Sequence, residues 1–140
     1  MSTDYATFSK NLKDDLRANG GRATIGRMAG RPLMIITTTG AKSGEPREAI
    51  CTYSRDGDAY VVVGSKGGAP ADPAWFTNLV ANPVVTVEVD GEKFQARAVL
   101  ATGADRDVLW ERHVAERPEF AEYPSKTERI IPMARLNRIA

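Results

Sequence analysis

"VVTVEVDGEKFQARAVL", residues 84–100, is the stretch that decides the fold class. Apolar side chains occupy alternate positions on both sides of Asp90-Gly91, a dipeptide that favours tight turns. The alternating residues are Val85, Val87 and Val89 before the turn, and Phe94, Ala96, Ala98 and Leu100 after it. A period of two residues is typical of strands with one buried face. The stretch therefore predicts an antiparallel β-hairpin that packs on a core.

Further strand patterns surround this hairpin. They are "LMIITTT" (33–39), "REAICTYSR" (47–55), "AYVVVG" (59–64) and "IIPMARLNRI" (130–139). Asp56-Gly57 predicts another tight turn, between the second and third of these segments. Because antiparallel hairpins dominate and no β-α-β alternation recurs, the order predicts a mainly β (α+β) fold. The architecture we expect is a small antiparallel barrel with peripheral helices.

The N-terminal segment "DYATFSKNLKDDLRANGG" has the spacing of an amphipathic helix. Its apolar residues recur every three or four positions, and they are Tyr5, Phe8, Leu12 and Leu16. Asn19, Gly20 and Gly21 end it. A helix lying on the core is favoured over one lying on a membrane or a partner. We therefore divide the chain into an N-terminal helix and connector (1–25) and one barrel domain (26–140).

Two more helices are expected between the strands. Asp72 followed by Pro73 is typical of an N-cap and a first helical residue, and "PAWFTNLVA" follows. Thr102 and Asp105 have the spacing of a capping box at the start of the helix predicted over 105–117.

Composition excludes several classes of function. The 140 residues carry a formal net charge of +1, so no bulk basic field points to nucleic acid. No stretch has the roughly 20 apolar residues of a membrane-spanning helix, and no signal-peptide core begins the chain. We expect a cytoplasmic protein with no obligate protein partner. Peripheral membrane contact through the N-terminal helix is the alternative.

The chemistry-bearing side chains are few. The single cysteine, Cys51, excludes an internal disulfide and is expected to be a buried, reduced thiol. His113 is the one histidine, and its charged helix predicts a surface position. No Ser/His/Asp trio at suggestive spacing and no His/Asp/Glu cluster is visible, so neither triad hydrolysis nor a metal site is predicted.

Two glycine-rich tips carry the remaining signal. "TTTGAKSGEPRE" (37–48) looks like a phosphate loop, but Ala41 separates Gly40 from Lys42 and a strand follows where a Walker A loop needs a helix. "GSKGGAP" (64–70) has similar chemistry. Glycine backbones, hydroxyls and lysines at both tips suit an oxyanion. On the residues alone, an anion cradle and two solvated turns are equal alternatives. With no acid/base or nucleophile set, the pattern suits a binding module or an enzyme whose cofactor carries the chemistry.

The motifs "LMIITTTGAKSGEPRE", "DGDAYVVVGSKGGAPADPAWFTNLVANPVVTVEV" and "RPEFAEY" together resemble the deazaflavin-dependent nitroreductase family, also described as coenzyme F420-dependent quinone reductases. The resemblance covers about residues 18–136. It implies a split β-barrel of the kind shared with FMN-binding and pyridoxamine-phosphate oxidases. It also implies hydride transfer from reduced coenzyme F420 to a quinone, a nitro compound, or an activated enone or lactone.

The resemblance also implies which residues bind the coenzyme. Lys42, Ser43 and Arg47 would meet its phosphate and charged tail, and Lys66 would lie near the phosphate. The full set of implied cofactor-binding residues is Lys42, Ser43, Arg47, Ile50, Cys51, Thr52, Val63, Gly64, Ser65, Lys66, Gly67, Gly68, Trp75 and Asn78.

Substrate and proton-donor positions follow from the same motifs. The implied substrate pocket consists of Thr52, Arg117, Phe120 and Tyr123. Tyr123 is the first candidate for the proton donor and Ser65 the second. Two alternatives stay open: an FMN-binding reductase on the same barrel, and a carrier that holds coenzyme F420 without turning it over.

Overall fold

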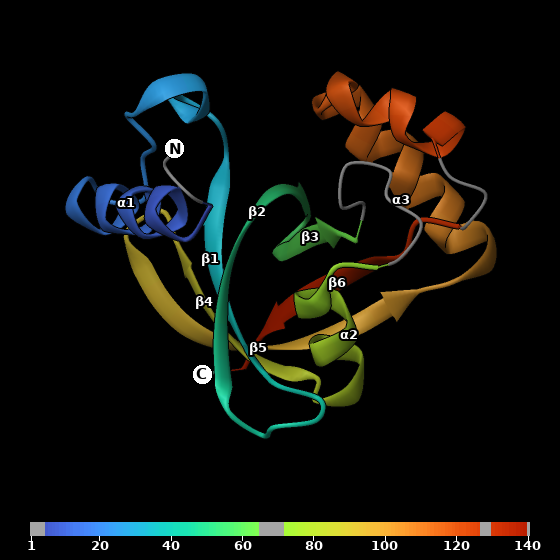
Figure 1. The fold of residues 1–140 in the computed structure, drawn as a ribbon. Helices are drawn as coiled ribbons and strands as arrows, with labels where there is room; N and C mark the ends of the chain where they lie inside the picture. Colours follow the sequence, from blue (N-terminus) through green and yellow to red (C-terminus); the bar gives the residue numbers. More distant parts are fainter. Residues whose placement is uncertain (1–4, 65–71, 127–129, 140) are drawn as a thin grey trace.

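Six strands close into an antiparallel barrel in the computed structural model, which describes residues 5–64, 72–126 and 130–139 (Figure 1). Around the barrel the strand order is β1-β2-β3-β6-β5-β4. The strands are β1 Leu33–Thr39, β2 Pro46–Asp56, β3 Ala59–Val63, β4 Val84–Val89, β5 Glu92–Ala101 and β6 Met133–Arg138. The predicted mainly β barrel with peripheral helices is therefore confirmed.

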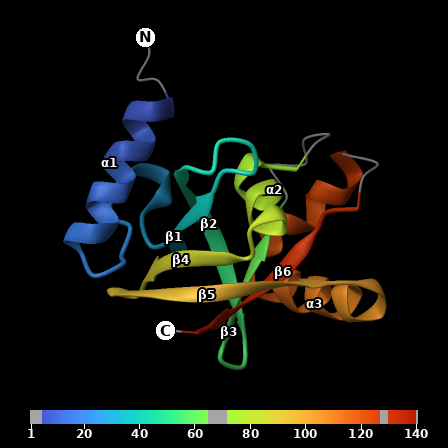
Figure 2. The same ribbon diagram turned by 90° about the horizontal axis from the view of Figure 1, so that it is seen from below.

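Helices surround the barrel on three sides. They are α1 Tyr5–Ala18, α2 Ala74–Ala81 and α3 Gly103–Glu116, with the short 3-10 helices η1 Gly26–Met28 and η3 Pro118–Lys126. Figures 1 and 2 show α1 and α3 on opposite flanks, with α2 near the loop that joins β1 to β2. Phe76 and Leu79 of α2 join the apolar core that fills the barrel. α2 therefore covers part of the barrel core with these two side chains.

The hairpin of β4 and β5 forms where the alternation places it. Val89 pairs with Glu92, and the two turn residues have the positive φ angles of a tight hairpin, 52° at Asp90 and 78° at Gly91. The three alternating valines of β4 are buried in the barrel. Leu100 differs from the prediction, since it is 44% exposed. β4 pairs with β5 only as far as Arg97, so Leu100 lies past that neighbour.

α1 uses its apolar face against the barrel. Leu12 and Leu16 are buried with Leu33 and Ile35 of β1 in one cluster. The structure thus has the helix lying on the core, as the spacing favoured. Within the described ranges, none of the helices is long and apolar enough to cross a bilayer.

Both predicted helix caps are wrong in detail. Pro73 keeps an extended backbone with ψ of 150° and is itself the N-cap of α2, so Asp72 lies before the cap. Thr102 is the N-cap of α3 but makes no side-chain capping hydrogen bond. The carboxylate of Asp105 is held instead by the guanidinium of Arg135 on β6, at 2.7 Å. A tertiary ion pair has replaced the local capping box.

His113 is not on the surface, as its charged helix predicted, but is buried at 1% exposure. It lies four residues after buried Leu109, on the face of α3 that packs on the barrel. Its Nδ1 is 2.7 Å from Ser54 Oγ, and its ring meets Phe120 edge-on at 4.5 Å. Burial, reinforced by the positive charge of Arg117, lowers the pKa of His113 to about 4.

This burial predicts how stability depends on pH. The folded pKa of about 4 lies below the ordinary value of 6.5, so the unfolded chain binds more protons between these limits. The free energy of unfolding should fall by about 2 kcal/mol as the pH drops from 7 to 5. Urea unfolding at both pH values measures it. His113→Asn, which keeps a partner for Ser54, should lose most of this slope, and an equal slope in both proteins would contradict the assignment.

Candidate coenzyme groove

A groove of about 1,060 Å³ is lined by the β1–β2 loop, the start of β2 and α2. The two walls come from segments about thirty residues apart that lie side by side in Figure 2. The described residues that line it are Gly40, Ala41, Lys42, Ser43, Arg47, Glu48, Ala49, Ile50, Pro73, Ala74, Trp75, Thr77 and Asn78. Among these described residues are two cations, Lys42 and Arg47, and one carboxylate, Glu48.

The β1–β2 loop is a compact turn in which Lys42 is exposed to solvent. The Gly40 amide donates to the Glu45 carbonyl at 2.8 Å, and the Gly44 amide donates to the Gly40 carbonyl at 2.9 Å. Ser43 Oγ accepts from the Glu45 amide at 3.2 Å. A strand, β2, begins directly after this turn, at Pro46. The loop therefore has neither the helix nor the geometry of a nucleotide triphosphate site.

Two asparagines, one in α2 and one at its C-cap, tie the helix to β1 and the β1–β2 loop. Asn78 Oδ1 accepts from the Ala41 amide at 3.0 Å, and Asn78 Nδ2 donates to Thr38 Oγ1 at 3.2 Å. Asn82 Nδ2 donates to the Thr39 carbonyl at 3.2 Å. The motif pointed to Asn78 as a groove residue, but its bond to the loop was not foreseen. The spacing of four residues, which places both amides on one helix face, was the available signal.

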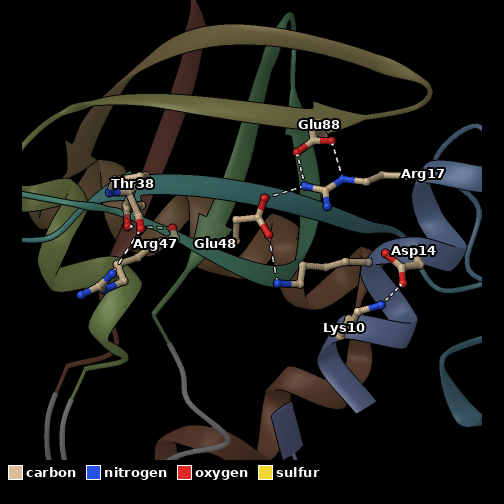
Figure 3. Close-up of polar contacts among 9 residues, drawn as sticks. Lys10, Asp14, Arg17, Thr38, Arg47, Glu48 and Glu88 are labelled. Atoms are coloured by element: carbon tan, nitrogen blue, oxygen red, sulfur yellow. Dashed lines mark hydrogen bonds and ion pairs between the residues drawn. The ribbon is translucent and has the colours of Figure 1, made fainter. Parts of the chain in front are cut away.

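Thr38 carries this connection into the strands. Its side chain is buried, accepts from Asn78, and donates to the Arg47 carbonyl at 3.4 Å (Figure 3). The Arg47 side chain points outward and lies 3.5 Å from the carboxylate of Glu45, with both groups largely exposed. The backbone of Arg47 is thus fixed while its guanidinium can turn toward a ligand. Sequence reasoning missed Thr38.

The acid on the groove wall is held by α1. Glu48 accepts from Lys13 Nζ at 3.0 Å and from Arg17 Nη2 at 2.6 Å (Figure 3). Arg17 also bridges to both carboxylate oxygens of Glu88, at 2.9 Å each. Hydrogen bonds from Arg17 and then Lys13 hold the pKa of Glu48 below its usual range. Nothing in the local sequence pairs these residues, which are brought together by α1 lying across β1.

The other predicted cofactor residues lie at varied distances from the groove. Ile50 and Trp75 line it. Cys51 is half-buried against the barrel core, so it is less buried than expected, and desolvation there raises the pKa of its thiol to about 12. Thr52 lies on β2 opposite Leu33. Val63 is buried under α3, and Gly64 leaves so little room that an added Cβ would lie 3.0 Å from the Phe76 ring.

Three of the predicted substrate residues, Thr52, Arg117 and Phe120, are not among the described residues that line this groove. Arg117 Nε donates to the Tyr53 carbonyl at 3.1 Å. Phe120 is buried in the cluster that α3 and η3 form with β3 and β6. Ser65, Lys66, Gly67 and Gly68, together with the Tyr123 side chain, lie outside the described residues. Their roles stay predictions.

Comparison with known proteins identifies the family. A sequence model described as F420H(2)-dependent quinone reductase matches residues 9–137. The chain belongs to the F420H(2)-dependent quinone reductase family. An F420H(2)-dependent quinone reductase of Mycobacterium tuberculosis is 41% identical over 127 residues, which cover 84% of each chain. The family resemblance read from the motifs is thereby confirmed.

Solved structures agree with the family. An F420-H2 dependent reductase is 37% identical, with a TM-score of 0.69, over 76% of this chain and 95% of its own. A candidate pyridoxamine 5′-phosphate oxidase of Listeria innocua shares the fold alone, at 13% identity and a TM-score of 0.56, over 79% of this chain and 86% of its own. The predicted kinship of the barrel with that fold is confirmed.

The groove fits the coenzyme that the family implies, coenzyme F420. Its volume suits a flat three-ring system with a chain attached, and Ile50 and Trp75 offer apolar surface. Lys42 and Arg47 add positive charge to the lining, which suits a ligand with a phosphate and an acidic tail. In the described part of the chain, no three metal-ligating side chains come together.

The tether through Asn78 can be tested directly. Asn78→Ala leaves the Ala41 amide and Thr38 Oγ1 without this partner, so the loop at 40–44 should open more often. We expect amide hydrogen exchange at Ala41 to speed up about tenfold or more, the scale of one lost hydrogen bond. Thr77→Ala, an exposed neighbour on α2, is the control. Equal exchange in the two variants would rule out the tether.

Proposed function

We propose that this protein transfers a hydride from reduced coenzyme F420 to a quinone. The observation that carries the proposal is the groove itself, whose described lining combines the cations Lys42 and Arg47 with the apolar side chains of Ile50 and Trp75 in a chain of this family. Bound coenzyme supplies the hydride from C5 of its reduced deazaflavin. The protein then has to bind the coenzyme, orient it toward the acceptor and exclude water.

The groove residues divide this work between them. Lys42 and Arg47, with the Ser43 hydroxyl, would hold the phosphate and acidic tail through charge-assisted hydrogen bonds. Ile50 and Trp75 would flank the ring system and keep water from it. Asn78 and Thr38 keep the loop against α2, so the two walls keep one separation. A fixed separation is what a hydride transfer over a short distance requires.

A proton donor to the reduced acceptor is the second requirement. The described lining of the groove contains no histidine and one carboxylate, which is ion-paired. We propose Tyr123 as donor, with Ser65 or water as alternatives, and Thr52, Arg117 and Phe120 as neighbours of the acceptor. The acceptor is a small molecule. Nitro compounds and activated enones or lactones are further candidate acceptors.

Two other functions remain testable alternatives. An FMN-binding reductase would use the same barrel, which proteins of different activity share. A carrier would bind coenzyme F420 without turnover. A peripheral membrane contact through α1 is a separate proposal. For that contact α1 offers exposed Phe8, whereas its Leu12 and Leu16 are buried against the barrel.

One pair of experiments separates these functions. Titration of the purified protein with coenzyme F420 and, separately, with FMN identifies the ligand. Reduced coenzyme F420 is then mixed with menadione, and its oxidation is followed by absorbance. Binding with turnover supports the proposal, and binding without turnover across a panel of acceptors supports a carrier. Preference for FMN would replace the deazaflavin assignment.

Arg47 gives the sharpest variant for the binding role. Arg47→Gln removes a charge whose weak, exposed contact with Glu45 adds little to stability. The dissociation constant for coenzyme F420 should rise about tenfold or more, the scale of a charge-assisted contact. Lys93→Gln is a matched control, because Lys93 lies on β5 away from the groove lining. An unchanged dissociation constant in Arg47→Gln would remove Arg47 from the site.

A further inference from the structure

Glu48 is out of place on the wall of a groove for an anion. The coenzyme we propose carries a phosphate and an acidic tail, and Glu48 lines the same groove as Lys42 and Arg47. An unpaired carboxylate there would repel the ligand and offset one of the two cations. The structure shows how this charge is handled, since Lys13 and Arg17 of α1 both bind it.

The geometry of the network is specific. Lys13 donates a hydrogen bond to one carboxylate oxygen of Glu48, and Arg17 donates to the other. Glu88 on β4 receives two further hydrogen bonds from Arg17 and orients its guanidinium (Figure 3). These two cations and two carboxylates sum to zero charge. Lys13 is the member to test, because removing it leaves a net negative charge beside the groove while Arg17 still bridges Glu48 and Glu88.

We propose that α1 is part of the coenzyme-binding apparatus, with Lys13 and Arg17 as positioning residues that neutralise and immobilise Glu48 so that an anionic coenzyme can enter. Neither cation lines the groove, so both act through Glu48. The Lys13 side chain is only 21% exposed and reaches from α1 to Glu48 on β2. The inference rests on the function proposed above and adds the N-terminal helix to its site.

Lys13→Met tests the inference, because it keeps the apolar stem and removes only the charge. The dissociation constant for coenzyme F420 should rise about three- to tenfold at low ionic strength. The increase should shrink as salt is added. Lys10→Met is the matched control, because Lys10 is one turn away, exposed, and paired with Asp14 of the same helix. It should leave the dissociation constant unchanged.

A second variant separates charge from packing. In Lys13→Met/Glu48→Gln the repelling carboxylate is gone, so affinity should return to within about twofold of the wild-type value. A helix merely loosened by the loss of Lys13 would not be rescued, because the Lys13–Glu48 ion pair is still absent. Thermal unfolding of each variant measures that loosening independently.

Each outcome decides the inference. Weakened binding in Lys13→Met with rescue by Glu48→Gln supports it. Unchanged binding in Lys13→Met, or weakened binding without rescue, overturns it while leaving the proposed function intact, provided the wild-type protein binds the coenzyme in the same titration. A wild-type protein with no affinity for the deazaflavin overturns both.

Discussion

The pairing of β1 with both β2 and β4 is the constraint on which the groove depends. β1 runs antiparallel to each of them, in a register that sets Thr38 opposite Arg47 and Ile35 opposite both Ile50 and Glu88. Side chains on its inner face fill the barrel, and those on its outer face carry α1. A slip of one residue would exchange these faces. It would separate Thr38 from α2 and Glu48 from α1 at once.

At each flanking helix, one arginine bridges two carboxylates between the helix and the barrel. Arg17 of α1 joins Glu48 and Glu88, and Arg135 of β6 joins Asp56 to Asp105 of α3. Isolated pairs this exposed contribute little to stability, but a shared guanidinium fixes the direction of both partners. The two networks are alike in form. Of the two, only the Arg17 network includes a residue of the described groove lining, Glu48. In the site we propose, the attachment of α1 is therefore linked to the charge of the groove wall.

The strands and the N-terminal helix could be predicted from sequence because their signals are local. Alternation of apolar residues and the turn dipeptides placed the hairpin of β4 and β5, and spacing placed α1 on the core. The capping box of α3 failed because Asp105 is drawn to Arg135, thirty positions later. The predicted surface position of His113 was wrong because most residues of the helix predicted over 105–117 are charged or polar. Leu109, four residues earlier on the same buried face, was too weak a signal against them. Leu100 is exposed because the pairing of β5 with β4 stops at Arg97, opposite the first residue of β4, and alternation does not encode how far a neighbouring strand reaches.

The sequence pointed to the loop and helix that line the candidate groove, and it missed the residues that hold them in place. Glycines, lysines and the motif pointed to the loop and to α2, since those residue types are suited to anions wherever they occur. Thr38, Lys13 and Arg17 carry no such signal, because a threonine in a strand and a basic residue on a helix are ordinary. Their importance comes from long-range closure, which sets Lys13 against Glu48, 35 residues away, and Thr38 against Asn78, 40 residues away. A groove that does its chemistry through a bound coenzyme needs stiff walls more than reactive groups, so in the site we propose much of the specificity would rest in residues that never touch the ligand.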